Sequence, residues 1–279
     1  MKAFEEHISE AVSAPFSGWD FSWLAARSTS GSLPWSFRHE VADRARSARS
    51  MLDMGTGGGE RLARLSPRPK LTVATEAWPP NVAVAAARLH PLGIAVVQDE
   101  GAPDNVRQES AQQGGAQPGG AKPDGAKPDG AQRGRLPFRD GAFGLVANRH
   151  EAFLAAEVSR VLAPGGAFIT QQADFHSYDD LYRLLGLEVP DQPDSWLPLA
   201  RQQVEDAGLV VQTAVCGDES QAFHDVGAVV YYLSVVSWAI PEFSIDACIP
   251  QLRAAHETPE IWPVRVRQRR FLLIATKPG

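Results

Sequence analysis

A glycine-rich turn preceded by an acid is the sharpest chemical pattern in this sequence of 279 residues. It reads Met51-Leu52-Asp53-Met54-Gly55-Thr56-Gly57-Gly58-Gly59-Glu60. Glycines let the backbone turn sharply and let a ligand approach it without a Cβ in the way. A nicotinamide-binding turn has the spacing G-x-G-x-x-G, whereas the sixth position counted from Gly55 is Glu60. The turn therefore predicts a cofactor site, and its spacing argues against a nicotinamide oxidoreductase.

Two acids stand at the ends of the next two apolar segments. Glu76 follows the segment 71–75, and a carboxylate there can accept hydrogen bonds from both hydroxyls of a ribose. Asp99 follows the segment 93–98, where an acid could bind an adenine amino group. The alternative for Glu76 is a solvated loop acid.

Four polar residues, Asn148-Arg149-His150-Glu151, follow a further apolar segment at 144–147. His150 has the right type of pKa for a general base near neutral pH, and its alternative is a structural histidine that orients the backbone. Arg149 could bind an anionic substrate or pair with a structural carboxylate. Glu151 is as well explained as an acid in the first turn of a helix.

Other candidates for contact with a substrate are amides and aromatic residues. Gln171 and Gln172 follow the segment 167–170 and suit hydrogen bonding to an acceptor, or capping of nearby backbone groups. Asp20 is a second candidate base. Aromatic residues could line a pocket for the acceptor, and the alternative for them is packing in the core. They are Trp19, Phe21, Trp23, Trp35, Tyr231, Tyr232 and Trp238. The predicted substrate-binding residues are Trp19, Arg149, Gln171, Gln172 and Tyr231.

Apolar segments of strand length alternate with segments of helix length through most of the chain. The expected strands are 50–54, 71–75, 93–98, 144–147, 167–170, 209–215 and 271–276. Such alternation predicts parallel βαβ units. In an open sheet of this kind, ligands bind beyond the carboxyl ends of the strands, which is where the candidate residues lie.

One segment breaks this pattern. Val106 is the only large apolar residue between 101 and 135. Within this segment, five-residue units begin at Gly115, Gly120, Gly125 and Gly130. We expect this insert to be disordered, because it cannot bury enough surface to offset its ordering entropy. The functional alternative is a substrate lid.

Four motifs, in their order along the chain, resemble the class I methyltransferases that depend on S-adenosylmethionine (SAM). They are Leu52-Asp53-x-Gly55-x-Gly57-x-Gly59, Glu76, Leu136-Pro137-Phe138-x-Asp140-x-x-Phe143 and Arg160-Val161-Leu162-x-Pro164-Gly165-Gly166. The resemblance implies an α/β fold, a Rossmann-like seven-stranded and mostly parallel sheet with helices on both faces and an antiparallel last strand. It implies SAM as cofactor and S-adenosylhomocysteine as product. The predicted cofactor-binding residues are Asp53, Gly55, Thr56, Gly57, Gly59, Glu76, Asp99 and Asn148.

Shorter strings are similar to a bacterial subfamily whose substrates are mostly unassigned. They include Gly18-Trp19-Asp20-Phe21-Ser22, Asn148-Arg149-His150-Glu151 and Thr170-Gln171-Gln172. Gly144 departs from the family, which usually has an acid there, and the insert is a second departure. We expect a helical cover at 1–49 and a methyltransferase domain at 50–279, with a helical substrate-side segment at about 223–262.

The composition limits the partners. The formal net charge is −6 and the sequence pI about 5.7, which does not favour a nucleic-acid binder. Cys216 and Cys248 lie outside any Cys/His ligand spacing, so no metal is expected. The acidic N-terminus does not fit a signal peptide, and the apolar stretch 226–240 is too short to span a bilayer. We expect a cytoplasmic protein without a membrane partner.

The leading interpretation is a methyltransferase that acts on an O, N or C nucleophile of a small molecule by in-line displacement. An RNA methyltransferase is the alternative, and it would use the basic segment Val264-Arg265-Val266-Arg267-Gln268-Arg269-Arg270. As a strand, that segment would point its valines inward and its arginines outward. A third interpretation is a SAM-binding protein without transferase activity. The sequence leaves the acceptor and the oligomeric state open.

Overall fold

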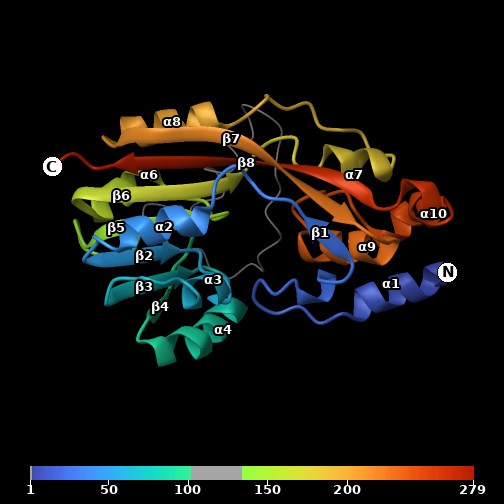
Figure 1. Ribbon diagram of the computed structural model, residues 1–279, viewed down its shortest axis with the longest axis horizontal. Coiled ribbons are helices and arrows are strands. Elements are labelled where there is room, and N and C mark those ends of the chain that lie inside the picture. The colour runs from blue at the N-terminus through green and yellow to red at the C-terminus, as the bar shows by residue number, and fades with distance from the viewer. Residues whose placement is uncertain (1, 102–133) are drawn as a thin grey trace.

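The computed structural model describes residues 2–101 and 134–279, which form one eight-stranded mixed sheet with helices on both faces (Figure 1). The strand order is β1-β7-β8-β6-β5-β2-β3-β4. The expected disorder of the insert concerns residues that, except for 101, 134 and 135, lie outside those described. The strands are β1 Ser28–Ser30, β2 Ser50–Met54, β3 Leu71–Glu76, β4 Ala95–Gln98, β5 Phe143–Arg149, β6 Leu162–Ala173, β7 Val210–Phe223 and β8 Val264–Thr276.

The parallel part of the sheet agrees with the expected Rossmann-like class. Strands β4, β3, β2, β5 and β6 are parallel neighbours, whereas β8 runs antiparallel to both β6 and β7. Parallel strands bring their carboxyl ends to one edge of the sheet. The residues that follow β2, β3 and β5 therefore meet there.

The sheet has one strand more than the seven expected. The additional strand lies within the N-terminal segment, which was expected to be helical. Ser28–Ser30 forms β1, which pairs antiparallel with the end of β7, so that Ser28 lies opposite Phe223. An exposed sheet edge offers unpaired backbone N–H and C=O groups, and β1 pairs with such groups on β7. The three-residue segment has no apolar alternation that would have revealed it.

The basic segment 264–270 and the last expected strand, 271–276, form one continuous strand, β8, from Val264 to Thr276. Val266 points inward, and Arg265 and Arg267 are exposed, as the alternation predicted. Arg270 differs from the prediction because its side chain is buried, with 7% of its surface exposed.

The helices lie on two faces of the sheet, and adjacent strand residues reach opposite faces. Leu52 packs in the cluster that includes α6 and α8, whereas its neighbour Met51 packs in the cluster that includes α2, α3 and α4. Pro79 begins α4, where its missing N–H costs nothing. The α-helices are α1 Phe4–Ser13, α2 Phe37–Ala45, α3 Glu60–Ala63, α4 Pro79–Leu89, α6 Ala155–Val161, α7 Asp179–Leu184, α8 Leu197–Asp206, α9 Val226–Val235 and α10 Ile245–His256.

A third cluster joins the N-terminal helix to the second half of the chain. Helix α1 packs on α9 beneath the long ends of β7 and β8 (Figure 1). Three short 3-10 helices complete the description: η1 Ser22–Leu24, η2 His90–Leu92 and η3 Pro259–Ile261. Within the described ranges, no helix combines the length and apolarity needed to cross a membrane.

Candidate functional site

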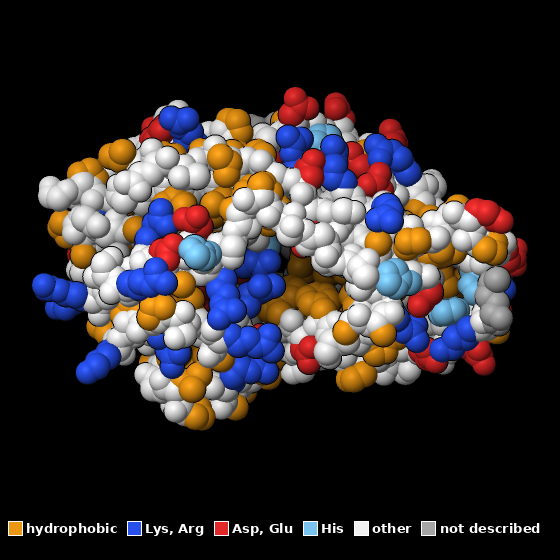
Figure 2. Space-filling model, in the orientation of Figure 1, with side chains coloured by type: hydrophobic (Ala, Val, Ile, Leu, Met, Phe, Trp, Pro, Cys, Tyr) orange, Lys and Arg blue, Asp and Glu red, His pale blue; other side chains and the backbone are white. Residues whose placement is uncertain are grey.

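The carboxyl ends of β2, β3, β5 and β6 open onto a cavity of about 1680 Å³. Figure 2 shows the hollow near the centre of the molecule, with hydrophobic side chains on its floor and Lys and Arg side chains on one side. The predicted site residues that line it come from the N-terminal segment and from these strand ends. They are Trp19, Asp20, Asp53, Gly55, Thr56, Glu76, Arg149, His150, Gln171 and Gln172.

The glycine turn crosses the end of β2 and leads into α3. Gly55, Gly57 and Gly59 have φ values of 66°, 63° and 78°, which L side chains rarely adopt. A Cβ on Gly57 would overlap the indole of Trp19, and a Cβ on Gly59 would lie 2.8 Å from Leu89 Cγ. Gly59 is therefore needed for helix packing, and neither Gly57 nor Gly59 lines the cavity.

The Glu76 carboxylate lies at the end of β3, beside this turn. It accepts hydrogen bonds from the backbone N–H groups of Gly57, at 2.7 Å, and Trp78, at 2.8 Å. Burial raises the pKa of Glu76 to about 7, against the lowering effect of the Trp78 N–H, and the charges of Glu151 and Asp99 add to the increase. Burial also raises the pKa of Asp53 to about 6. Two desolvated carboxyl groups thus lie beside one glycine turn.

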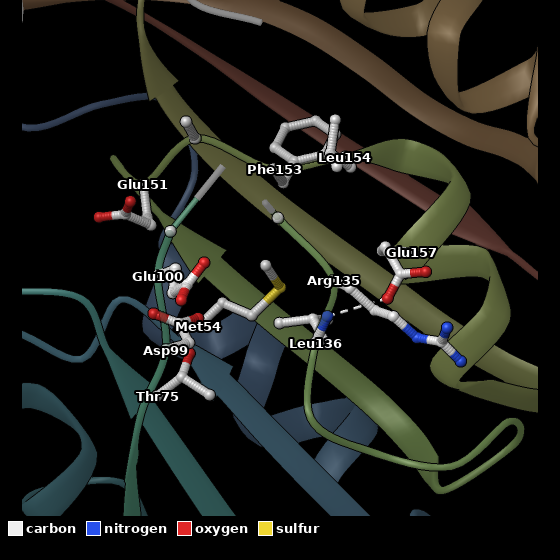
Figure 3. Close-up of a pocket in the computed structure, with 13 residues that line it drawn as sticks. Met54, Thr75, Asp99, Glu100, Arg135, Leu136, Glu151, Phe153, Leu154 and Glu157 are labelled. Atoms are coloured by element: carbon white, nitrogen blue, oxygen red, sulfur yellow. Dashed lines mark hydrogen bonds between the residues drawn. The ribbon is translucent and has the colours of Figure 1, made fainter. Parts of the chain in front are cut away.

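Asp99 lines a smaller neighbouring pocket instead of the large cavity. In Figure 3 the side chains of Asp99, Glu100 and Met54 lie on one side of this pocket, and Phe153 and Leu154 lie on another. The pocket combines acidic oxygens with apolar side chains. It adjoins the end of β3, since the backbone N–H of Asp99 donates to the carbonyl oxygen of Glu76 at 3.3 Å.

Besides Gly57, Gly59 and Asp99, two further predicted contact residues lie outside the cavity lining. Asn148 is within β5, fully buried, and its Oδ1 accepts from Thr170 Oγ1 at 2.9 Å and Gln172 Nε2 at 2.6 Å. Its Nδ2 has no hydrogen-bond partner among the described residues. Tyr231 is buried against Trp23, with ring centroids 4.6 Å apart, and the next residue, Tyr232, lines the cavity in its place. Tyr231 lies outside the cavity lining because successive helix positions differ in direction by about 100°.

His150 follows β5 directly and has a left-handed φ of 62°. Its backbone N–H donates to the Gln171 carbonyl oxygen at 2.9 Å, and its side chain is exposed to the cavity. Desolvation by the surrounding protein lowers the pKa of His150 well below its ordinary value, and the charges of Arg149, Arg270 and Arg61 lower it further. The imidazole is therefore neutral at pH 7 and can accept a proton.

The two glutamines already have partners inside the protein. Gln171 Oε1 accepts from Trp35 Nε1 at 2.9 Å. Gln172 Nε2 donates to Asn148, to Thr170 Oγ1 at 2.7 Å and to the Glu151 carbonyl oxygen at 3.1 Å. The contact of Gln172 with a backbone carbonyl is of the capping kind that was the alternative to substrate binding, whereas the other contacts are with side chains.

The N-terminal candidates border the cavity together. The Asp20 carboxylate accepts from the Ser22 N–H at 2.9 Å. Trp19 stacks on Phe21 with centroids 5.9 Å apart and meets Trp238 edge-on at 5.5 Å. Trp238 lies just after α9, so two segments that are far apart in the sequence form one aromatic wall.

The sequence analysis missed several polar residues that line the cavity, among them Arg61, Glu219, Gln268 and Arg270. Gln268 and Arg270 belong to the alternating segment of β8, whose arginines were expected to point outward, and no pattern in the sequence singled out Arg61 or Glu219. Within residues 2–101 and 134–279, no group of three or more His, Cys, Asp or Glu side chains could hold a metal ion.

No protein-family model and no curated protein matches the sequence. Solved structures do match. The YcgJ protein from Bacillus subtilis has 16% identity and a TM-score of 0.50 over 87% of this chain and 98% of its own. A functionally unknown protein from Deinococcus radiodurans R1 has 14% identity and a TM-score of 0.50 over 88% and 90% of the two chains. A candidate methyltransferase from Bacillus halodurans C-125 has 17% identity and a TM-score of 0.49 over 86% and 100%. Similarities at these identities describe the fold alone.

Proposed function

We propose that this chain, which has the fold of the class I SAM-dependent methyltransferases, binds SAM and transfers its methyl group to a nucleophilic atom of a small molecule. One observation carries the proposal. The glycine turn and Glu76 open onto the same cavity as His150 and Arg149, so a cofactor and an acceptor would meet there.

The residues beside the glycine turn fit the polar parts of SAM. Glu76 is a desolvated carboxylate that would accept hydrogen bonds from the ribose hydroxyls, which are neutral donors. The acids near the turn, Asp53 among them, suit the positive charge of the cofactor. Asp99 lies in the adjoining pocket of acidic and apolar side chains, which suits adenine. We infer that Asp53, Gly55, Thr56, Glu76 and Asp99 hold the cofactor.

The protein's own contribution to methyl transfer is positioning and proton removal. When bound, SAM would supply a methyl group carried on a sulfonium, and S-adenosylhomocysteine would be the leaving group when the acceptor takes that methyl group. Orientation in a closed cavity supplies much of the rate enhancement, with contributions of about 7–11 kcal/mol in favourable systems. His150, neutral and open to the cavity, accepts the proton that an O–H or N–H acceptor loses.

The first test is calorimetric titration with SAM, S-adenosylhomocysteine and NADH. We expect the two sulfur ligands to bind and NADH not to bind. Replacement Glu76→Ala should weaken binding of both sulfur ligands by about tenfold or more, because hydrogen bonds to a charged group contribute about 1.5–3 kcal/mol. Glu260→Ala is the matched control, since Glu260 is exposed on η3 and does not line the cavity.

Binding of NADH with neither sulfur ligand would refute the proposal. Equal losses in Glu76→Ala and Glu260→Ala would remove Glu76 from the cofactor site. A protein that binds both sulfur ligands but never releases S-adenosylhomocysteine from SAM with any acceptor would be a SAM-binding protein without transferase activity.

A further inference from the structure

Three arginines from separate parts of the chain line one part of the cavity. Arg61 belongs to α3, Arg149 to β5 and Arg270 to β8. Arg270 is buried, Arg149 is half-buried, and Arg61 is exposed to the cavity. Their charges act on one another, because burial lowers the pKa of Arg149 to about 9 and the charges of Arg61 and Arg270 contribute to this shift.

None of these three arginines forms an ion pair with a described residue. Elsewhere the described arginines commonly do, as Arg160 does with Glu157 at 2.7 Å. The charge of Glu219 on β7 acts on both Arg149 and Arg61, and those of Glu60 and Asp53 act on Arg61 as well. Among the described residues, none of these acids forms an ion pair with either arginine. Guanidinium groups that are desolvated near one another without an ion pair raise the free energy of the folded protein. A bound anion would lower that free energy.

The guanidinium group of Arg270 is hydrogen-bonded only to neutral groups among the described residues. Its guanidinium donates to Gln268 Oε1, to the Arg269 carbonyl oxygen at 2.9 Å and to Ser177 Oγ at 3.4 Å. Gln268 is in turn fixed by Gln221 and by Tyr232 Oη at 3.2 Å. These partners orient the guanidinium without neutralising it.

SAM as a whole does not match the charge of three guanidinium groups. SAM carries a sulfonium, an ammonium and one carboxylate, so its net charge is positive, and the acids Asp53, Glu76 and Glu151 lie around the glycine turn. Arg61, two residues after Gly59, lies near these acids, and its charge acts on Asp53. Arg149 and Arg270 line the cavity from β5 and β8. The single carboxylate of SAM therefore provides one negative charge for a cavity lined by three arginines.

We propose that the acceptor is an anionic small molecule whose carboxylate or phosphate group binds Arg61, Arg149 and Arg270. Its apolar body lies against the aromatic wall made by Trp19, Phe21, Tyr232 and Trp238. Guanidinium groups match carboxylate and phosphate oxygens in pairs of parallel hydrogen bonds. This assignment rests on the proposed function, because it places the acceptor in the same cavity as the cofactor.

The test uses the full-length protein saturated with S-adenosylhomocysteine and three aromatic probes. Phenylacetate carries a carboxylate, phenyl phosphate a phosphate, and phenylacetamide is the neutral counterpart. Calorimetry should give at least tenfold tighter binding for one of the anions than for phenylacetamide, and the better anion identifies the group. Arg149→Gln should weaken that anion at least tenfold while the affinity for S-adenosylhomocysteine changes less than twofold.

Two further variants keep the test interpretable. Arg61→Gln, on a side chain exposed to the cavity, should give the same loss with little effect on folding, and Arg149→Lys should restore part of the anion affinity. Arg265→Gln is the matched control, because Arg265 is exposed on β8 and does not line the cavity.

Each contrary result has a separate meaning. Equal binding of all three probes, or no binding of any while S-adenosylhomocysteine still binds, overturns the anionic acceptor and leaves the proposed function intact. Loss of S-adenosylhomocysteine affinity in Arg149→Gln would assign the arginines to the cofactor carboxylate. Binding of a 12-nucleotide single-stranded RNA that Arg149→Gln abolishes, with no binding of the small anions, would replace the small acceptor by a nucleic acid. Failure of both sulfur ligands to bind the unmodified protein refutes the proposed function itself.

Discussion

His150 combines an unusual backbone conformation with an unusual charge environment. Its φ of 62° turns the chain at the end of β5 and directs the imidazole into the cavity. Arg149, Arg270 and Arg61 disfavour its protonation, after the larger effect of burial. A bound anion would offset these charges and make the imidazole more basic, so the acceptor would promote its own deprotonation.

Replacement His150→Asn should lower kcat by about 10²–10⁴-fold, the usual contribution of a general base. Asparagine tolerates a left-handed backbone conformation better than alanine does, so the turn after β5 should persist. Calorimetry should show unchanged affinity for S-adenosylhomocysteine. The measurement is the rate of S-adenosylhomocysteine release with the acceptor that the anion probes identify.

His176→Asn is the matched control for this variant. His176 has a φ of 63°, and its side chain lies outside the cavity lining, beside Asp179. Wild-type turnover in both variants would show that neither histidine removes a proton and that His150 only orients the backbone.

At the scale of elements, the glycine turn connects β2 to α3 and supports α4. Gly59 is the N-cap of α3, with φ 78°, and it lies against Leu89 near the end of α4. The sequence pattern assigned Gly59 to the cofactor, whereas the structure shows a packing reason for the missing side chain. Close approach of α3 and α4 keeps the turn in its position at the end of β2.

Gly59→Ala should lower the free energy of unfolding by about 2–4 kcal/mol. Left-handed backbone costs alanine about 1 kcal/mol relative to glycine, and overpacking against Leu89 adds about 1–3 kcal/mol. Gly165→Ala is the control: Gly165 has φ 72° but no atom within 4 Å of an added Cβ. It should lose only about 1 kcal/mol. Urea denaturation measures both, and equal losses would show that the contact with Leu89 can relax at no cost.

At the scale of the whole molecule, the cavity lies where the parallel half of the sheet meets the long antiparallel strands. One wall comes from the ends of β2, β3, β5 and β6, and the other from β7, β8, α9 and the N-terminal segment. Acids collect beside the glycine turn, where burial raises the pKa values of Glu76 and Asp53. The stability of the unliganded protein should therefore depend on pH.

Glu76 has a higher pKa in the folded protein, about 7, than its ordinary value of 4.5. Its contribution to stability is fully present below about pH 4.5 and is lost as the pH rises through 7. The difference corresponds to about 3 kcal/mol. Relative to Glu76→Gln, the free energy of unfolding of the unmodified protein should fall by up to that amount between pH 4.5 and 8. Urea denaturation of both proteins at several pH values measures the difference between their free energies of unfolding. The contributions of the other titrating groups cancel in that difference.

Glu260→Gln should show the same pH dependence as the unmodified protein, because Glu260 is exposed. Parallel curves for Glu76→Gln and the unmodified protein would mean that the Glu76 carboxyl group titrates near its ordinary pKa.

The sequence by itself determined the order of strands and helices in the parallel part of the sheet, and with it the Rossmann-like class. It also determined the glycine turn and the position of Glu76 at a strand end. These features are local: apolar periodicity follows from which face a residue buries, and glycine spacing follows from the backbone conformation of one turn. Patterns of this kind can be recognised without knowing which elements become neighbours.

Only the tertiary structure decided how the cavity is lined. Arg61, Arg149 and Arg270 are far apart in sequence, and they meet because β8 inserts between β6 and β7 and curves past the ends of the parallel strands. The direction of α9 decided that Tyr232 lines the cavity and Tyr231 does not. Sheet order and helix rotation depend on the packing of the whole core, so no short stretch of sequence specifies them.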